Sequence, residues 1–204
     1  MKHTEQFVQI FSYTCLLDMM RASRIPSTLA VLVLALAAGG NAFAQERKPL
    51  RFELLPPAGT IANCIPNGRA EVTVFPKEEI NGTDTLQLKA SGLVPNIEVT
   101  VFLTELAAPP FGAVEYIGDF KTNAAGEGSF RANTIVNEAF ASVTVGGTRV
   151  RTDLNHVVLW FADPADDDVC FAPNSGPVTP FDGDGNAGAT ILSSANSLPG
   201  APLP

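Results

Sequence analysis

The chain has 204 residues, of which 46% are hydrophobic, and a formal net charge of −8 at pH 7. An acidic chain is repelled by nucleic-acid phosphates and anionic membrane surfaces, and this sequence has no basic stripe to reverse that repulsion. These properties argue against a nucleic-acid partner.

The first predicted element is a secretory signal peptide in residues 20–44. Arg21 and Arg24 form a basic start, an unbroken apolar run follows at 29–38, and Ala42-Phe43-Ala44 has the small-residue pattern of a cleavage site. The run is shorter than the about 20 apolar residues that a membrane helix needs, so we predict no membrane span. We expect the protein to be secreted or periplasmic.

Residues 1–19 precede this signal as an N-terminal extension, so either Met1 or Met20 starts the natural protein. Removal of residues 1–44 leaves 45–204 as a single predicted domain with ten basic and nineteen acidic residues, a net charge of −9. The proline-rich end of this domain, from about residue 195, is expected to be a flexible tail.

Two cysteines, Cys64 and Cys170, lie in the predicted mature chain. In an exported protein such a pair predicts one disulfide. Two free thiols or a metal-binding pair are the alternatives. A metal site would need more ligands nearby, and His156 is the one histidine of the mature chain.

Apolar and polar residues alternate with a period of two along most of the mature chain. In the segment 84–90, for example, Leu86 and Leu88 fall on one face, while Gln87 and Lys89 fall on the other. Turn residues separate the alternating segments every 8 to 15 positions. Short strands separated at about this spacing are typical of β-sandwiches and β-barrels. The pattern predicts an all-β fold, an antiparallel β-sandwich of about seven to nine strands. The predicted strands are 50–55, 69–75, 84–90, 97–103, 115–122, 128–136, 156–162 and 188–194.

Two details of this pattern carry separate expectations. The segment 136–145 is ambiguous, and we interpret it as one possible short helix that turns into a strand. Trp160, in the middle of a predicted strand, is expected in the core beside the disulfide.

The segment Leu86–Leu103 contains Gly92, Leu93 and Pro95 between two strands, and the segment Phe120–Ala132 contains a glycine-rich hairpin. These segments resemble the corner and the hairpin of immunoglobulin-like and fibronectin type III-like modules. As a whole, the chain is similar to uncharacterised exported bacterial proteins with such a β-sandwich. The resemblance implies an immunoglobulin-like sandwich and an exported location, and it carries no catalytic residue with it.

Acidic residues in two predicted loops raise the question of calcium. Asp182, Asp184 and Asn186 occupy the first three ligand positions of a calcium loop, but the glycine and glutamate that an EF-hand needs further on are missing. Asp166 and Asp168 lie in a second acidic loop. Solvated turns are the favoured interpretation, and a simple calcium site made by these two loops is the alternative; no other cofactor is expected.

Aromatic residues beside prolines mark a candidate binding loop. Pro110, Phe111 and Tyr116 lie in or next to one apolar loop, and Phe181 lies in another. Aromatic side chains are enriched at interfaces but also in cores. The alternative is that they cover the ends of the sandwich.

No constellation in the sequence predicts catalysis. A serine–histidine–aspartate site with His156 and Asp153 has no nucleophile motif, and a pair of carboxylates usually needs a larger scaffold with a deep cleft. We therefore predict a non-catalytic secreted module for binding, adhesion or envelope association, whose partner is an unknown extracellular protein or glycan. The alternatives are a calcium-binding structural module and an enzyme or accessory protein that acts on an extracellular polymer.

Overall fold

The computed structural model describes residues 48–76, 82–179 and 185–194. All of them lie in the second of the two units into which the chain divides, 1–45 and 46–204. The predicted leader and the predicted tail lie outside the described residues. Within them, no helix is both long and apolar enough for a membrane crossing. The described strands are β1 Leu50–Leu54, β2 Arg69–Phe75, β3 Asp84–Ser91, β4 Glu98–Thr104, β5 Val114–Lys121, β6 Gly128–Thr134, β7 Phe140–Val145, β8 Thr148–Asp153, β9 His156–Phe161 and β10 Thr190–Ser193.

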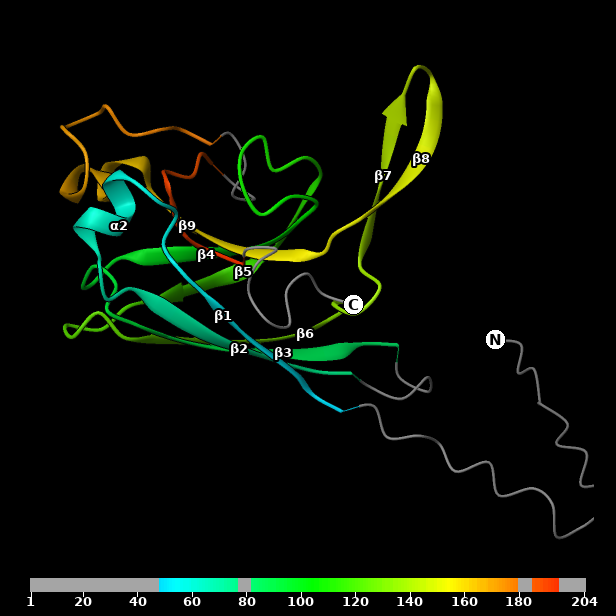
Figure 1. The fold of residues 1–204 in the computed structure, drawn as a ribbon, viewed down its shortest axis with the longest axis horizontal. Helices are drawn as coiled ribbons and strands as arrows, with labels where there is room; N and C mark the ends of the chain where they lie inside the picture. The colour runs from blue at the N-terminus through cyan, green and yellow to red at the C-terminus, as the bar shows by residue number, and fades with distance from the viewer. Residues whose placement is uncertain (1–47, 77–81, 180–184, 195–204) are drawn as a thin grey trace, which may run out of the picture. The chain divides into compact units, whose positions relative to one another are not determined.

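The strands form two antiparallel sheets of four strands and a separate hairpin (Figure 1). Sheet A has the order β1-β2-β3-β6, and sheet B has the order β10-β9-β4-β5. The prediction of an all-β, antiparallel fold is confirmed. The described residues contain ten strands, more than predicted, because the sequence pattern did not reveal β8.

One hydrophobic core contains side chains from both four-stranded sheets. Sheet A contributes alternate residues, such as Val72 and Leu88, and its opposite face carries polar residues, as the period of two predicted. Sheet B contributes Val101 and Leu159. At one edge, Leu55 and Ser193 exchange both backbone hydrogen bonds and thereby join β1 of sheet A to β10 of sheet B.

Sheet B differs from sheet A because its strands β4 and β9 are buried on both faces, whereas its edge strand β5 is largely exposed. Every residue of β9 is buried, which explains its unbroken apolar sequence HVVLWF. The face of sheet B that points away from the main core carries a second cluster of Phe102, Val158 and Trp160, which is joined by Ala187. Trp160 is therefore buried as expected, but our placement of it beside the disulfide was wrong, since Cys64 and Cys170 pack against the main core.

Of the ambiguous segment 136–145, residues 140–145 form the strand β7, and the possible short helix before it is absent. Instead, Asp84 Oδ2 accepts hydrogen bonds from the backbone amides of Val136 (2.9 Å) and Asn137 (2.7 Å), which ties this stretch to sheet A. Short helical segments occur elsewhere in the described chain, as α2 Thr60–Cys64 and the 3₁₀ helix η3 Pro164–Val169.

Candidate functional site

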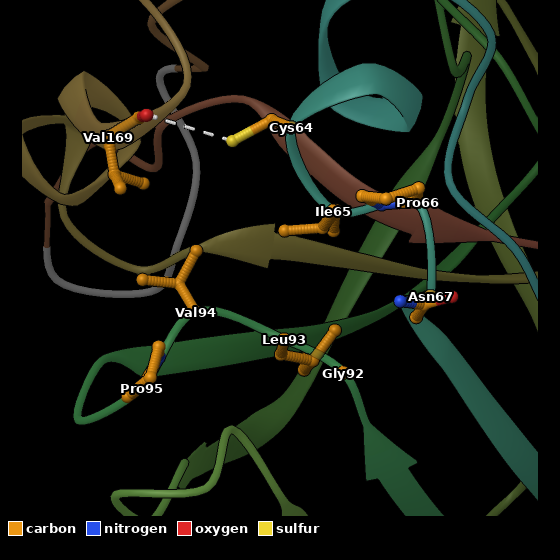
Figure 2. A pocket seen from close by; sticks show the side chains of 9 residues that line it. All are labelled: Cys64, Ile65, Pro66, Asn67, Gly92, Leu93, Val94, Pro95 and Val169. Atoms are coloured by element: carbon orange, nitrogen blue, oxygen red, sulfur yellow. Dashed lines mark hydrogen bonds between the residues drawn. The ribbon is translucent and has the colours of Figure 1, made fainter.

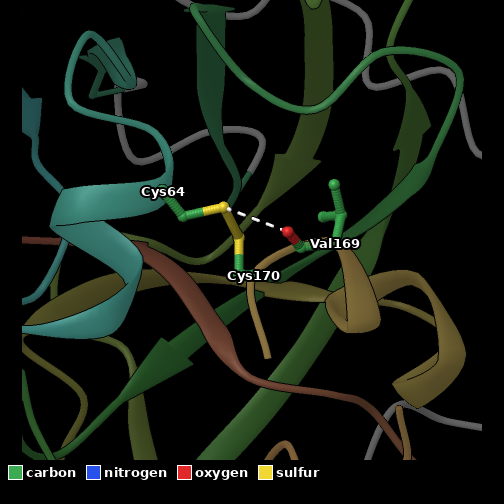
Figure 3. The surroundings of a disulfide bond; sticks show 3 residues. All are labelled: Cys64, Val169 and Cys170. Carbon is green, nitrogen blue, oxygen red and sulfur yellow. Dashed lines mark hydrogen bonds between the residues drawn. A yellow bond between two sulfur atoms is a disulfide. The ribbon is translucent and has the colours of Figure 1, made fainter. Parts of the chain in front are cut away.

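The predicted disulfide is present between Cys64 and Cys170 (Figure 3). The two Cα atoms are 5.4 Å apart, and the bridge joins residues separated by 106 positions. It links the end of α2 to the residue that follows η3. Cys64 Sγ lies 3.7 Å from the carbonyl oxygen of Val169. A disulfide sulfur has no proton to donate, so this contact is packing rather than a hydrogen bond.

A shallow groove of about 340 Å³ lies beside the bridge (Figure 2). Three segments line it: the end of α2 with the turn that follows, the turn between β3 and β4, and the end of η3. A second hollow of about 430 Å³ shares Pro66, Asn67 and Gly92 with it and continues towards Arg69. The two together offer an elongated surface. The apolar residues of the first groove are Ile65, Pro66, Leu93, Val94, Pro95 and Val169.

The walls of this groove are held by close packing of backbone on backbone. Gly92 has a φ of 68°, and a Cβ there would collide with the carbonyl group of Asn67. The buried Leu93 donates its backbone amide to the carbonyl oxygen of Gly126 at 3.1 Å. The Thr122 hydroxyl donates to the carbonyl oxygen of Val94 at 2.7 Å. The corner noted in the sequence thus forms one side of a rigid groove.

The acidic loop next to the groove uses its carboxylates to accept hydrogen bonds from backbone amides, two in the loop itself and one at Ala189. Asp163 caps η3 by accepting the amide of Ala165, and Asp168 accepts the amide of Asn174. Asp167 is buried, and its carboxylate accepts the amide of Ala189 at 2.8 Å. Burial raises the pKa of the Asp167 carboxyl, the Ala189 bond opposes that rise, and the charge of Asp168 adds to it.

The predicted calcium ligands are only partly visible. Asp166 is half-buried and Asn186 is exposed. Burial, followed by the charges of Asp163 and Glu98, raises the pKa of the Asp166 carboxyl. Asp182 and Asp184 lie outside the described residues. Within 48–76, 82–179 and 185–194, no three acidic, histidine or cysteine residues gather in a metal-binding group. The calcium site stays a prediction.

The loop with the candidate binding aromatics covers the outer face of sheet B. The Phe111 ring packs edge-on against Trp160 with 4.8 Å between ring centroids. Ser193 Oγ anchors the loop by donating to the carbonyl oxygen of Ala107 at 2.8 Å. Pro110 and Tyr116 are exposed beside it, and Phe181 lies outside the described residues. Phe111 therefore has a packing role, and a binding role for this loop stays a prediction.

His156 is the first residue of β9 and is buried, with 4% of its surface exposed. Ser194 Oγ accepts the amide of Val157 (3.1 Å) and lies 3.2 Å from His156 Nδ1, so its hydroxyl proton can bond a neutral imidazole. Asp153, the aspartate of the alternative triad, is paired instead with Arg151 at 2.8 Å. Burial lowers the pKa of His156, and a hydrogen bond with the backbone of Ser194 partly offsets that effect.

This lowered pKa predicts a loss of stability in mild acid. Between the folded-state pKa and about 6.5, the unfolded chain binds a proton that the folded chain resists, so the free energy of unfolding falls as pH falls. We expect the His156→Gln variant to lose this part of the pH dependence. The measurement is urea unfolding of both proteins from pH 8 down to pH 5, and the compared quantity is the difference between their free energies of unfolding at each pH. Subtraction removes the contribution of Asp166 and Asp167, whose raised pKa values act in the opposite direction. Parallel curves for the two proteins would contradict the prediction.

Sequence reasoning did not identify the groove beside the disulfide. Its apolar residues are ordinary turn and strand-end residues, and three separate segments meet there. Two features of the sequence could have pointed to the groove. They are the predicted disulfide and the corner at Gly92, each of which lies in one of its walls. No family model matches the chain, and neither a curated protein nor a solved structure matches it.

Proposed function

We propose that this protein is an exported, non-catalytic binding module with an immunoglobulin-like β-sandwich, which holds an extended apolar segment of an extracellular partner protein in the groove beside Cys64–Cys170. The groove is the observation that carries the proposal. It is open and lined mainly by apolar groups, and its nine lining residues include no ionisable side chain, because Cys64 is bridged. The second hollow, which reaches Arg69, lengthens it.

Rigidity supports this function. A groove whose walls are fixed before binding costs less conformational entropy when a ligand docks. Here the bridge fixes η3 to α2, and the packing of Gly92 on Asn67 fixes the third wall. Export is supported by the leader pattern of residues 20–44 and by the bridge, since disulfides persist in oxidising compartments.

The surroundings of the groove favour a particular partner chemistry. Val169, at its rim, directly follows the acidic residues of η3, and Glu98 lies close enough to Asp166 to influence its pKa. An apolar segment flanked by basic residues would satisfy both the groove and this acidic border.

Capture from native culture fluid and envelope extract tests the proposal. We expect the Val169→Asp variant to lose at least about tenfold of the captured partner, because a charge in the apolar groove is left without a partner. Val178→Asp is the matched control, since Val169 is 59% exposed and Val178 is 57% exposed, and Val178 does not line the groove. Equal capture by the two variants would remove the groove from the function.

A further inference from the structure

The hairpin β7–β8 is exposed along most of its length. It pairs with neither four-stranded sheet, and Figure 1 shows it extending away from them. Val145 is 63% exposed and Val150 is 43% exposed. A two-stranded hairpin without further cover is only marginally stable in water. Such an element gains stability from an added strand.

The two faces of the hairpin differ in chemistry. Cross-strand pairs place Arg149, Arg151 and Asp153 on one face, where Arg151 lies over the Phe140 ring at 4.2 Å. The opposite face has no charge on either strand. Its residues are Ala141, Val143, Val145, Thr148, Val150 and Thr152.

The turn determines which backbone groups remain open. Gly146 and Gly147 both have positive φ, 56° and 82°, as in a two-residue turn of type I′. The flanking pair Val145–Thr148 then exchanges both backbone hydrogen bonds, and bonded pairs alternate along the ladder. The amides and carbonyls of Arg149, Arg151 and Asp153 therefore point away from β7. In the part of the chain that the structure describes, β8 pairs with β7 alone.

We propose that the open edge of β8 pairs antiparallel with β8 of a second copy of this chain. A twofold axis at Arg151 places Arg149 opposite Asp153 of the other copy, and this pairing occurs twice. It also places Arg151 opposite Arg151 of the other copy, where each guanidinium is paired with Asp153 and lies over Phe140 of its own chain.

Shifting the axis by one residue to Val150 would instead place Arg149 opposite Arg151 of the other copy twice, which is repulsive. Charge complementarity excludes that register. An axis at Thr152 would pair Arg151 with Asp153 twice. It would leave Arg149 opposite Asn155, beyond the end of β8. The register at Arg151 uses the open backbone groups of all three residues.

The same register joins the uncharged faces of the two hairpins. Val150 lies opposite Thr152 of the other copy, so the four strands present one continuous face without charge. Residues 140–153 carry a net charge of +1, whereas residues 45–204 carry −9. The hairpin therefore lacks the acidic charge that would make two copies of this chain repel each other elsewhere.

Sedimentation equilibrium of the purified chain and its variants tests the pairing. We expect wild type to form dimers, and we expect Arg149→Asp and Asp153→Arg each to weaken dimerisation on the order of tenfold or more, because both pairs become repulsive. An equimolar mixture of the two variants should dimerise again. The first variant carries a carboxylate at both positions and the second a guanidinium at both, so each pair in the mixed dimer joins opposite charges. Circular dichroism checks that both variants fold.

Arg131→Asp, on exposed β6, is the matched control and should leave the dimer intact. Two outcomes overturn the proposal. One is a wild-type protein that stays monomeric at its highest soluble concentration. In that case the arginines would prevent pairing at an exposed strand edge. The other is a dimer in which the mixture of variants does not restore association.

Discussion

Replacing both Cys64 and Cys170 by alanine is expected to lower the free energy of unfolding by about 4–5 kcal/mol, the largest effect that we expect from any change in this protein. The bridge closes a loop of 106 residues, which spans most of the domain. A long cross-link removes many conformations from the unfolded chain, and so the folded state is favoured. Urea unfolding followed by circular dichroism measures the difference.

A reducing agent supplies the control for this prediction. It should lower the stability of wild type by a similar amount and leave the double alanine variant unchanged, since that variant has no bridge to reduce. A wild-type protein that loses less than about 1 kcal/mol under full reduction would contradict the entropic explanation. Reduction should also weaken partner capture by the groove at temperatures where the sheets remain folded, because η3 is then no longer fixed to α2.

Replacing Trp160 by alanine is expected to cost about 3–5 kcal/mol of folding free energy. Its ring is almost completely buried on the outer face of sheet B, between Phe102 at 4.7 Å and Phe111 at 4.8 Å. The vacated volume cannot collapse, because β4 and β9 hold the neighbouring side chains in a rigid ladder. Chemical unfolding followed by circular dichroism is the measurement, since the variant has no tryptophan left to fluoresce.

Trp160→Phe is the matched control for this loss. The indole nitrogen of Trp160 is buried and has no hydrogen-bond partner within the described residues, and the same holds for the hydroxyl of Thr100, its cross-strand neighbour. Phenylalanine keeps much of the ring contact and removes the unpaired donor, so we expect it to cost much less than alanine. Equal costs for the two variants would indicate that the indole nitrogen is bonded in the folded protein.

The strands packed on the core could be predicted from the sequence almost residue by residue. The segment 69–75 coincides with β2, and 84–90 is one residue shorter than β3. These strands have one buried and one solvated face, so apolar and polar side chains alternate along them with a period of two. β8 escaped prediction because both its faces are exposed: its charged residues alternate with Thr148, Val150 and Thr152, and no core selects a strongly apolar side.

The sequence by itself determined the local properties: the alternation that makes sheet A, the acidic charge, and the pair Cys64 and Cys170 that the structure joins. Only the tertiary structure decided the placements that depend on segments distant in the chain. It put Trp160 on the outer face of sheet B, assembled the groove from residues 64–67, 92–95 and Val169, and left the hairpin β7–β8 apart from both sheets. The physical reason is that alternation fixes which side chains share a face of a strand, whereas the cover of that face is chosen by packing between elements far apart in sequence.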